Sequence, residues 1–211
     1  MNLIFGANGH ATEIEWLAHV CSTPLGADYR AHSFVVQDVS PQAKHVGLPV
    51  ITESEALQIA GPLNGFIAVG QPQLRQQIWR KFDKPATSWP VLMHPSVIFD
   101  SRPGRLDVGQ GCFVFPGCTL TSQIKIGQHV HVNVDCSISH DVCIGDFCTL
   151  SPGVRLAGKV HLADRVFVGM GAVVIDKIHI CSDAIIGAGA VVVSNIEQPG
   201  IYVGVPAKMI K

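Results

Sequence analysis

His140 and Asp141 are the residues whose types and spacing point most directly to acid–base chemistry. An imidazole can take a proton from an attacking amine or hydroxyl near neutral pH. Neighbouring side chains on a strand point apart, so Asp141 can meet His140 only in a turn; otherwise it is an ordinary solvated aspartate. Acyl transfer from a thioester needs a base and N–H donors for the developing oxyanion. The backbone N–H of Gly158, further along the chain, is the candidate donor.

The spacing from position 140 to position 158 matters because the chain repeats with a period of six from position 108 to position 197. Fifteen hexads follow one another without an insertion, each starting with Val, Leu or Ile and carrying Ala, Cys, Val or Ile at its fifth position. This period fits neither a helix nor a simple strand, and it is typical of a hexapeptide-repeat parallel β-helix. Three hexads make one coil and coils stack at roughly 4.8 Å, so we expect His140 and Gly158, one coil apart, on one face.

Residues 1–93 follow a different pattern, in which short apolar strands alternate with helices. We expect strands at 3–5, 33–37 and 66–69 and helices at 11–21, 52–60 and 71–82, the second opened by a capping box at Thr52. This pattern predicts a small parallel α/β domain over residues 1–93. The β-helix with a capping tail then occupies residues 94–211, with an irregular first coil at 97–107.

A glycine loop, Gly6-Ala7-Asn8-Gly9-His10, joins the first strand to the first helix. Such a loop can offer backbone N–H groups and a helix N-terminus to a phosphate. The full dinucleotide fingerprint would have glycines at positions 8 and 11, so NAD is disfavoured. From the loop alone, a tight turn and an anion site are equally good interpretations.

Composition limits the other partners. The formal net charge is −1 and only 15% of the residues are charged, so no basic field would attract nucleic acid or anionic lipid. The longest apolar runs are shorter than the roughly 18 residues of a membrane span, and no signal peptide is evident, so we expect a cytoplasmic protein. Four of the seven cysteines occupy fifth positions and are expected to be small core residues, without disulfides.

Several motifs together resemble one family along essentially the whole chain: Gly6-Ala7-Asn8-Gly9-His10, His94-Pro95-Ser96, Asn133, Ile138-Ser139-His140-Asp141, the hexads and Gly204-Val205-Pro206-Ala207-Lys208. The family is the bacterial sugar acyltransferases, which include nucleotide-aminosugar N-acetyltransferases and sialic acid O-acetyltransferases. The resemblance implies a Rossmann-like domain followed by a left-handed β-helix. It also implies a homotrimer with active sites between chains; the spacing of the repeats shows neither handedness nor assembly.

The resemblance also implies roles for residues in the reaction. Acetyl-CoA would be the acyl donor, and no metal is expected. His140 would be the base, Asp141 would orient it, the Gly158 N–H would bind the thioester oxygen, and Asn133 matches an active-site Asn. The pantetheine arm of the cofactor would lie along smooth coils and contact Gly171, Ala172, Gly187 and Ala188. Lys208, in the tail, would lie near a phosphate of the cofactor. The nucleotide-activated aminosugar would be held by Gly9, His10 and Asp38, the last contacting ribose or base.

The predicted function is therefore acetyl-CoA-dependent N-acetylation of the 4-amino group of a nucleotide-linked deoxyaminosugar. O-acetylation of sialic acid is the main alternative, and the family's frequent second His is replaced here by Thr149, which leaves the acceptor open. A zinc enzyme like the γ-type carbonic anhydrases is a distant alternative, because His161 and His179 lie one coil apart but the closely spaced ligand pair of those enzymes is missing. A non-catalytic scaffold is disfavoured by the unbroken hexads and the retained turn His.

Overall fold

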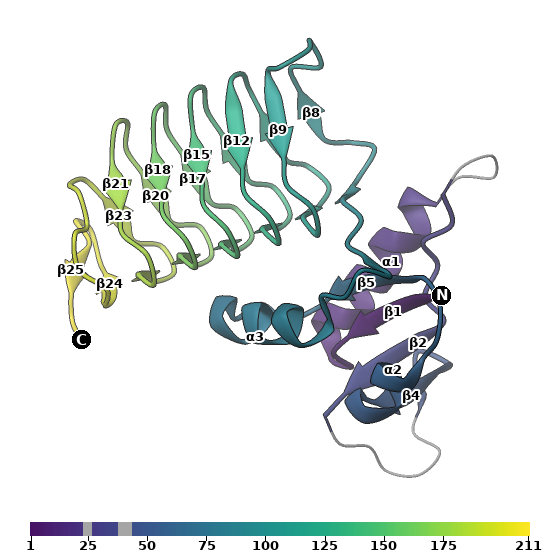
Figure 1. Cartoon of the computed structure of the whole chain (residues 1–211). Coiled ribbons are helices and arrows are strands. Elements are labelled where there is room, and N and C mark those ends of the chain that lie inside the picture. Colours follow the sequence, from purple (N-terminus) through teal and green to yellow (C-terminus); the bar gives the residue numbers. More distant parts are fainter. Residues whose placement is uncertain (23–26, 38–43) are drawn as a thin grey trace.

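The hexads form a parallel β-helix in the computed structural model, which describes residues 1–22, 27–37 and 44–211 (Figure 1). Every fifth position of the fifteen hexads is buried, and so is every first position except Val108, which is half-buried. Each short strand covers the sixth position of one hexad and the first of the next. The repeat therefore places its two small-to-medium apolar positions inside the coil, as the sequence predicts.

The strands stack into three sheets that form the sides of the β-helix. Sheet I contains β7 (Leu92–Met93), β10 (Phe113–Val114), β13 (His131–Val132), β16 (Thr149–Leu150), β19 (Phe167–Val168), β22 (Ile185–Ile186), β24 (Ile201–Val203) and β25 (Lys208–Met209). Sheet II contains β8 (Ile98–Phe99), β11 (Thr119–Leu120), β14 (Ser137–Ile138), β17 (Arg155–Leu156), β20 (Val173–Val174) and β23 (Val191–Val192). Sheet III contains β9 (Leu106–Val108), β12 (Ile124–Ile126), β15 (Cys143–Ile144), β18 (His161–Leu162) and β21 (His179–Ile180).

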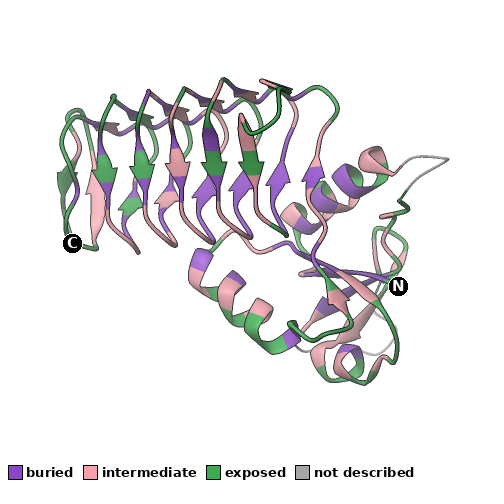
Figure 2. Cartoon of the chain, turned by 45° about the horizontal axis from the view of Figure 1, so that its top comes forward, coloured by how far each residue is buried: buried purple, intermediate pink, exposed green. Residues whose placement is uncertain are grey.

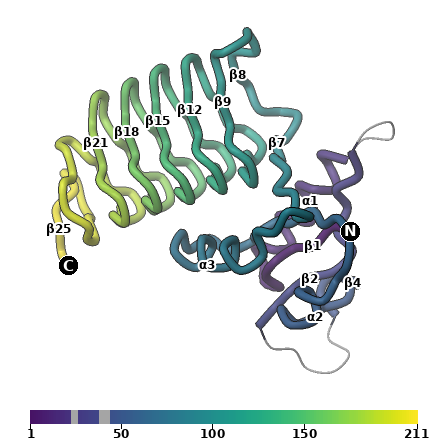
Figure 3. The backbone as a smooth tube through the Cα atoms, viewed as in Figure 1, coloured from purple at the N-terminus to yellow at the C-terminus, as the bar shows by residue number. Residues whose placement is uncertain are grey.

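Partners in each of the three sheets are one coil apart and parallel within the repeat region, for example Ser137 and Arg155. Pairing begins earlier than the sequence pattern indicates, because β7 already joins β10. At the far end the tail strand β24 pairs with β22, and β25 pairs antiparallel with β24 (Figure 3). The tail thus covers the last open strand edge, which would otherwise offer unpaired backbone groups.

Residues 1–93 contribute a six-stranded sheet of order β3-β4-β2-β1-β5-β6, in which only the β3–β4 pair is antiparallel. Its strands are β1 (Asn2–Phe5), β2 (Ser33–Val36), β3 (Lys44–His45), β4 (Leu48–Thr52), β5 (Leu63–Ile67) and β6 (Thr87–Ser88). Its helices are α1 (Gly9–Cys21), α2 (Glu53–Gln58) and α3 (Pro72–Phe82). Thr52 and Glu55 form the predicted capping box at the start of α2. None of the described helices is long and apolar enough to cross a membrane.

The α/β sheet packs against the start of sheet I through α1. Ile14 and Leu17 of α1 share one apolar cluster with Phe66 of β5 and with Phe113 and Phe115 of the β-helix. Both residues of β10, β13 and β16 are buried, whereas Ile185 of β22 is exposed. At the C-terminal end of the β-helix the strands are half-buried or exposed (Figure 2). The α/β part therefore buries the first coils most fully, and Gln73 of α3 still reaches a later coil, where its amide donates to the Asp183 carboxylate at 3.0 Å.

Candidate active site

His140 and Asp141 meet at the turn between β14 and β15. Asp141 has a φ of 60°, a left-handed conformation that bends the chain, and the two side chains contact at 2.8 Å between His140 Nδ1 and Asp141 Oδ2. The carboxylate can only accept a hydrogen bond, so Nδ1 is the donor in this contact, and in a neutral imidazole Nε2 then keeps a free lone pair. The His140 side chain is 62% exposed, so that lone pair is accessible from solvent.

Gly158 lies directly against the imidazole, where the spacing of one coil predicts it. A Cβ added to Gly158 would be 2.7 Å from both Nε2 and Cε1 of His140, so a side chain at this position would displace the ring. Gly158 is buried, and its amide donates to no acceptor among the described residues. A backbone amide without an acceptor therefore belongs to the residue that packs against the imidazole, and acyl transfer requires a base and a donor of these two kinds.

Gln123 and Arg105 also belong to the cluster around His140 and Asp141. Neither residue was predicted from the sequence. With its amide turned to satisfy both neighbours, Gln123 donates to Asp141 Oδ1 at 2.9 Å and accepts from Arg105 Nη1 at 3.1 Å. Gln123 stands one coil before Asp141, so the repeat could have revealed it. Its effect is to hold the second carboxylate oxygen and thereby the orientation of His140.

Asn133 and the residues predicted to bind the cofactor lie on a different corner, between sheets I and II. Asn133 Nδ2 donates to the Leu150 carbonyl at 2.7 Å. Along the same corner Gly171 and Ala188 are exposed, and a Cβ on Gly171 would meet nothing within 4 Å. Ala172 is fully buried, and its amide and carbonyl are both hydrogen-bonded within the β-helix.

Gly187 is covered by the tail. A Cβ there would be 2.7 Å from Val203 Cγ1, and Val203 pairs with Lys208 on β25. Lys208 is exposed, so an ammonium group stands at the end of the corner that carries Gly171 and Ala188. Asn133, Gly171, Gly187 and Ala188 therefore lie along one corner of the β-helix, and His140 of the same chain lies on another.

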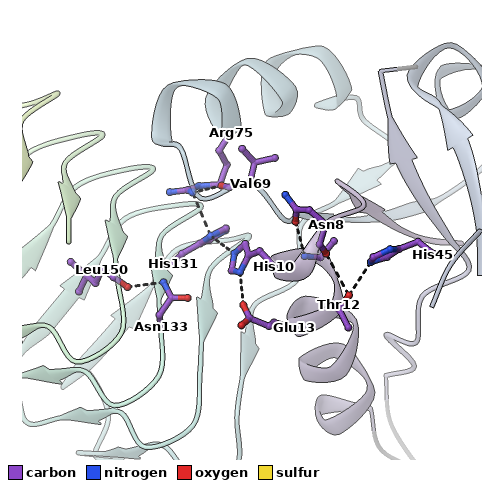
Figure 4. A network of polar contacts seen from close by, with 11 residues as sticks. Asn8, His10, Thr12, Glu13, His45, Val69, Arg75, His131, Asn133 and Leu150 are labelled. Atoms are coloured by element: carbon purple, nitrogen blue, oxygen red, sulfur yellow. Dashed lines mark hydrogen bonds and ion pairs between the residues drawn. The ribbon is translucent and has the colours of Figure 1, made fainter. Parts of the chain in front are cut away.

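The glycine loop opens α1, but its histidine faces the β-helix. Asn8 caps α1 by accepting from the Ala11 amide at 3.1 Å. His10 contacts Glu13 through Nδ1 at 2.9 Å and His131 through Nε2 at 3.3 Å (Figure 4). Gly9 is exposed at the start of α1, and Asp38 lies outside the described residues.

Arg75 of α3 links this region to the β-helix, and sequence reasoning gave no signal for it. Its side chain is fully buried and donates to the Val69, Gly70, His129, Phe147 and Cys148 carbonyls and to Thr149 Oγ1. Burial lowers the pKa of Arg75 to about 9. Burial, followed by the charge of Arg75, also lowers the pKa of His129 to about 3 and holds that of His131 well below its usual range.

Thr149, which stands where the family often has a second His, is part of this buried junction. Its hydroxyl donates to the Gly70 carbonyl at 2.7 Å and accepts from Arg75 Nη2 at 2.9 Å. The residue therefore joins α3 to sheet I and does not face solvent.

The zinc alternative finds no site in the part of the chain that the structure describes. The rings of His161 and His179 are 4.9 Å apart on sheet III, as their spacing predicts. However, no three His, Cys, Asp or Glu side chains of the described residues gather as metal ligands would.

No protein-family model and no curated protein matches the chain. Solved structures do match. Perosamine N-acetyltransferase from Caulobacter crescentus, in complex with coenzyme A and GDP-perosamine, is 30% identical with a TM-score of 0.86, over 100% of this chain and 97% of that chain. WeeI from Acinetobacter baumannii is 27% identical with a TM-score of 0.89, over 100% and 99% of the two chains.

The acetyltransferase domain of PglB from Neisseria gonorrhoeae, in complex with acetyl coenzyme A, is also similar. It is 27% identical with a TM-score of 0.71, over 99% of this chain and 98% of that chain. Two further structures of the Caulobacter enzyme, with a TM-score of 0.87 or 0.86, carry a substitution of one histidine. With 30% identity across nearly the full length of both chains, this chain belongs to the bacterial sugar acyltransferases of the left-handed β-helix type.

Proposed function

We propose that this protein transfers the acetyl group of acetyl-CoA to the 4-amino group of a nucleotide-linked deoxyaminosugar. The observation that carries the proposal is the contact of His140 Nδ1 with Asp141 at 2.8 Å, with Gly158 of the next coil packed so closely that a Cβ there would meet the ring. The 30% identical relative was solved with coenzyme A and GDP-perosamine, which supports an aminosugar over sialic acid as the acceptor.

The chemistry divides between two groups of the chain. Acetyl-CoA supplies the acetyl group as a thioester when it is bound. His140 Nε2 takes the proton from the attacking amine, while Asp141 stabilises the imidazolium that forms and keeps Nε2 directed outward. The Gly158 amide donates to the carbonyl oxygen as negative charge develops there. The proton held at Nε2 is then available to the departing thiolate.

The cofactor would lie along the corner between sheets I and II. Gly171 and Ala188 present little side chain beside the exposed Met170, so a flexible pantetheine arm can pack there, with Gly187 next to it and Ala172 beneath. Lys208, exposed on β25, would pair with a phosphate of the cofactor. Asn133 would act near the reacting group on the same corner.

The α/β part, residues 1–93, would be a Rossmann-like acceptor domain, and residues 94–211 the acyltransferase domain. Gly9 and His10 belong to the loop that opens α1, where backbone N–H groups favour a diphosphate. Asp38 remains a predicted contact to the nucleoside. Because His140 and this loop are on different sides of one chain, we propose a homotrimer in which one chain supplies the base and its neighbour the acceptor.

A thiol-release assay tests the function. Acetyl-CoA is incubated with the protein and, in separate reactions, with UDP-, dTDP- and GDP-linked 4-aminosugars and free sialic acid. We expect thiol release, and an acetylated product by mass spectrometry, only with a nucleotide-linked aminosugar. Release with sialic acid alone would favour O-acetylation, and no release with any acceptor would contradict an acyltransferase acting on sugars.

A further inference from the structure

A cavity opens where β1, β2 and β5 end, between the start of α2 and one side of α3. It has a volume of about 390 Å³, and its apolar walls come from Val36, Leu74 and Ile78. In parallel α/β sheets, ligands bind at the carboxyl ends of the strands. A slot with apolar walls at this edge suits a flat aromatic ring, such as a nucleobase.

Two charged side chains, Glu53 and Lys81, line the same cavity. They form an ion pair, and only 17% of the Glu53 side chain is exposed. Glu55, the other acidic residue in the first turn of α2, is occupied by the capping box, where it accepts from the Thr52 amide at 2.7 Å. Glu53 contacts only Lys81 among the described residues, so it keeps acceptor sites for a ligand, and Lys81 keeps donors.

We propose that this cavity binds the base of the acceptor and that Glu53 and Lys81 select guanine. The edge of guanine offers N1–H and the N2 amino group, two donors that one carboxylate can accept together, next to O6, which an ammonium group can donate to. Uracil and thymine offer one N–H between two carbonyl oxygens, and a carboxylate repels those oxygens. Adenine presents a ring acceptor where guanine has N1–H.

The position of the cavity agrees with the glycine loop. Gly6, the first residue of the loop, also lines the cavity, and its φ of 122° with a would-be Cβ 3.1 Å from the Ala68 carbonyl leaves room only for glycine. A base in the cavity would thus place its diphosphate at the loop and the start of α1. The inference rests on the proposed function only in taking the ligand to be a nucleotide-linked sugar. The preference for one base is measured by nucleotide binding, without acetyl transfer.

Calorimetric titration of the full chain with GDP, UDP, dTDP and ADP tests the inference. We expect GDP to bind at least about tenfold more tightly than the other three, since two charge-assisted hydrogen bonds are lost with them. Glu53→Gln should weaken GDP binding at least about tenfold and leave UDP binding within about twofold. Glu15→Gln on α1, outside the cavity, is the matched control and should change neither.

Lys81→Gln provides a second variant that does not depend on α2, and thermal unfolding checks that each variant folds. It too should weaken GDP binding more than UDP binding. Equal affinity for GDP and UDP in the unmodified protein, or an equal loss for all nucleotides in both variants, would overturn the inference. If GDP binding depends on Glu53 but no GDP-aminosugar is acetylated, the inference holds and the proposed function fails.

Discussion

The catalytic proposal depends on a turn conformation that brings two adjacent side chains together. The fourth position of the hexad is left-handed in fourteen turns, and nine of those residues are not glycine, Asp141 among them. On a strand His140 and Asp141 would diverge. Here the turn directs both outward, and Gln123 and Gly158, one coil to either side, fix the carboxylate and leave room for the ring.

His140→Ala removes the proposed base and should lower kcat for acetyl transfer by about 10²- to 10⁴-fold, the usual contribution of a general base. KM for acetyl-CoA should change little, because the proposed cofactor strip is on another corner. Steady-state kinetics with the acceptor found in the thiol-release assay give both values. Gln123→Ala, which only loosens Asp141, should lower kcat less; full activity in His140→Ala would exclude the mechanism.

Two buried histidines predict how folding stability depends on pH. The pKa values of His129, lowered to about 3, and of His131, also lowered, lie below that of an unfolded histidine near 6.5. The unfolded chain therefore binds protons that the folded chain does not, and stability falls as pH drops below about 6.5. Between pH 7 and 5 we expect a loss of ~2 kcal/mol from His129 and a further loss from His131.

Urea unfolding at pH 7 and pH 5 measures this loss. His129→Phe, which keeps the ring stacking on Phe147, should reduce the difference by about 2 kcal/mol. Gln110→Ala, at an exposed residue without a titrating group, is the control and should leave the difference unchanged. A stability that is equal at the two pH values would show that the two buried rings are not protected from protonation.

At the scale of elements, the three corners of the β-helix differ in the residues they present. Each corner keeps its residue types over several coils because residues one coil apart stack on one another. The corner between sheets II and III carries His140 and Gly158. The corner between sheets I and II is smooth at Gly171 and Ala188 and ends at the tail. The remaining corner, around Phe147, is covered by Arg75 of α3. One repeat thus supplies a catalytic corner, a smooth corner and an anchored corner.

Ala188→Trp tests the smooth corner. Ala188 is exposed, so the indole should be tolerated by the fold while it blocks the path proposed for pantetheine. We expect KM for acetyl-CoA to rise at least about tenfold, since losing a well-packed contact commonly costs about 1.4 kcal/mol or more. Gln110→Trp, exposed on another corner, is the matched control; an unchanged KM in Ala188→Trp would move the cofactor elsewhere.

At the scale of the whole molecule, one chain separates the groups that the reaction must bring together. His140 is on the corner between sheets II and III, whereas the glycine loop and α1 pack on sheet I (Figure 1). Asn133 lies on the corner between sheets I and II. A second copy of the chain, placed so that its catalytic corner faces the loop and Asn133 of the first, would complete the site.

Complementation tests this arrangement. Asn133→Ala and His140→Ala are first assayed alone, where each should be strongly impaired, and are then co-expressed. A site formed between chains predicts that mixed assemblies regain a measurable fraction of the activity, because some interfaces contain neither substitution. Sedimentation of the unmodified protein should give the mass of three chains. No recovery in mixed assemblies, with both single variants inactive, would place the whole site within one chain.

The period of six was enough to predict the β-helix and the proximity of His140 and Gly158. This is because a repeat without insertions sets both the inward positions and the coil length, and neither depends on contacts with distant segments. The capping box at Thr52 was equally local, since its partner Glu55 lies within the same helical turn. These features follow from short-range geometry, which the order of residues carries directly.

Only the tertiary structure decided which groups meet across the two parts of the chain. Arg75 looks like an ordinary solvated residue of an amphipathic helix, yet it satisfies the backbone carbonyls of His129 and Phe147, far along the chain in the β-helix. Likewise, the His10 contact to His131 and the Glu53 pair with Lys81 arise from packing of separate elements. A polar group finds its partner wherever burial leaves one, and that location depends on how whole elements dock, which no repeat or motif records.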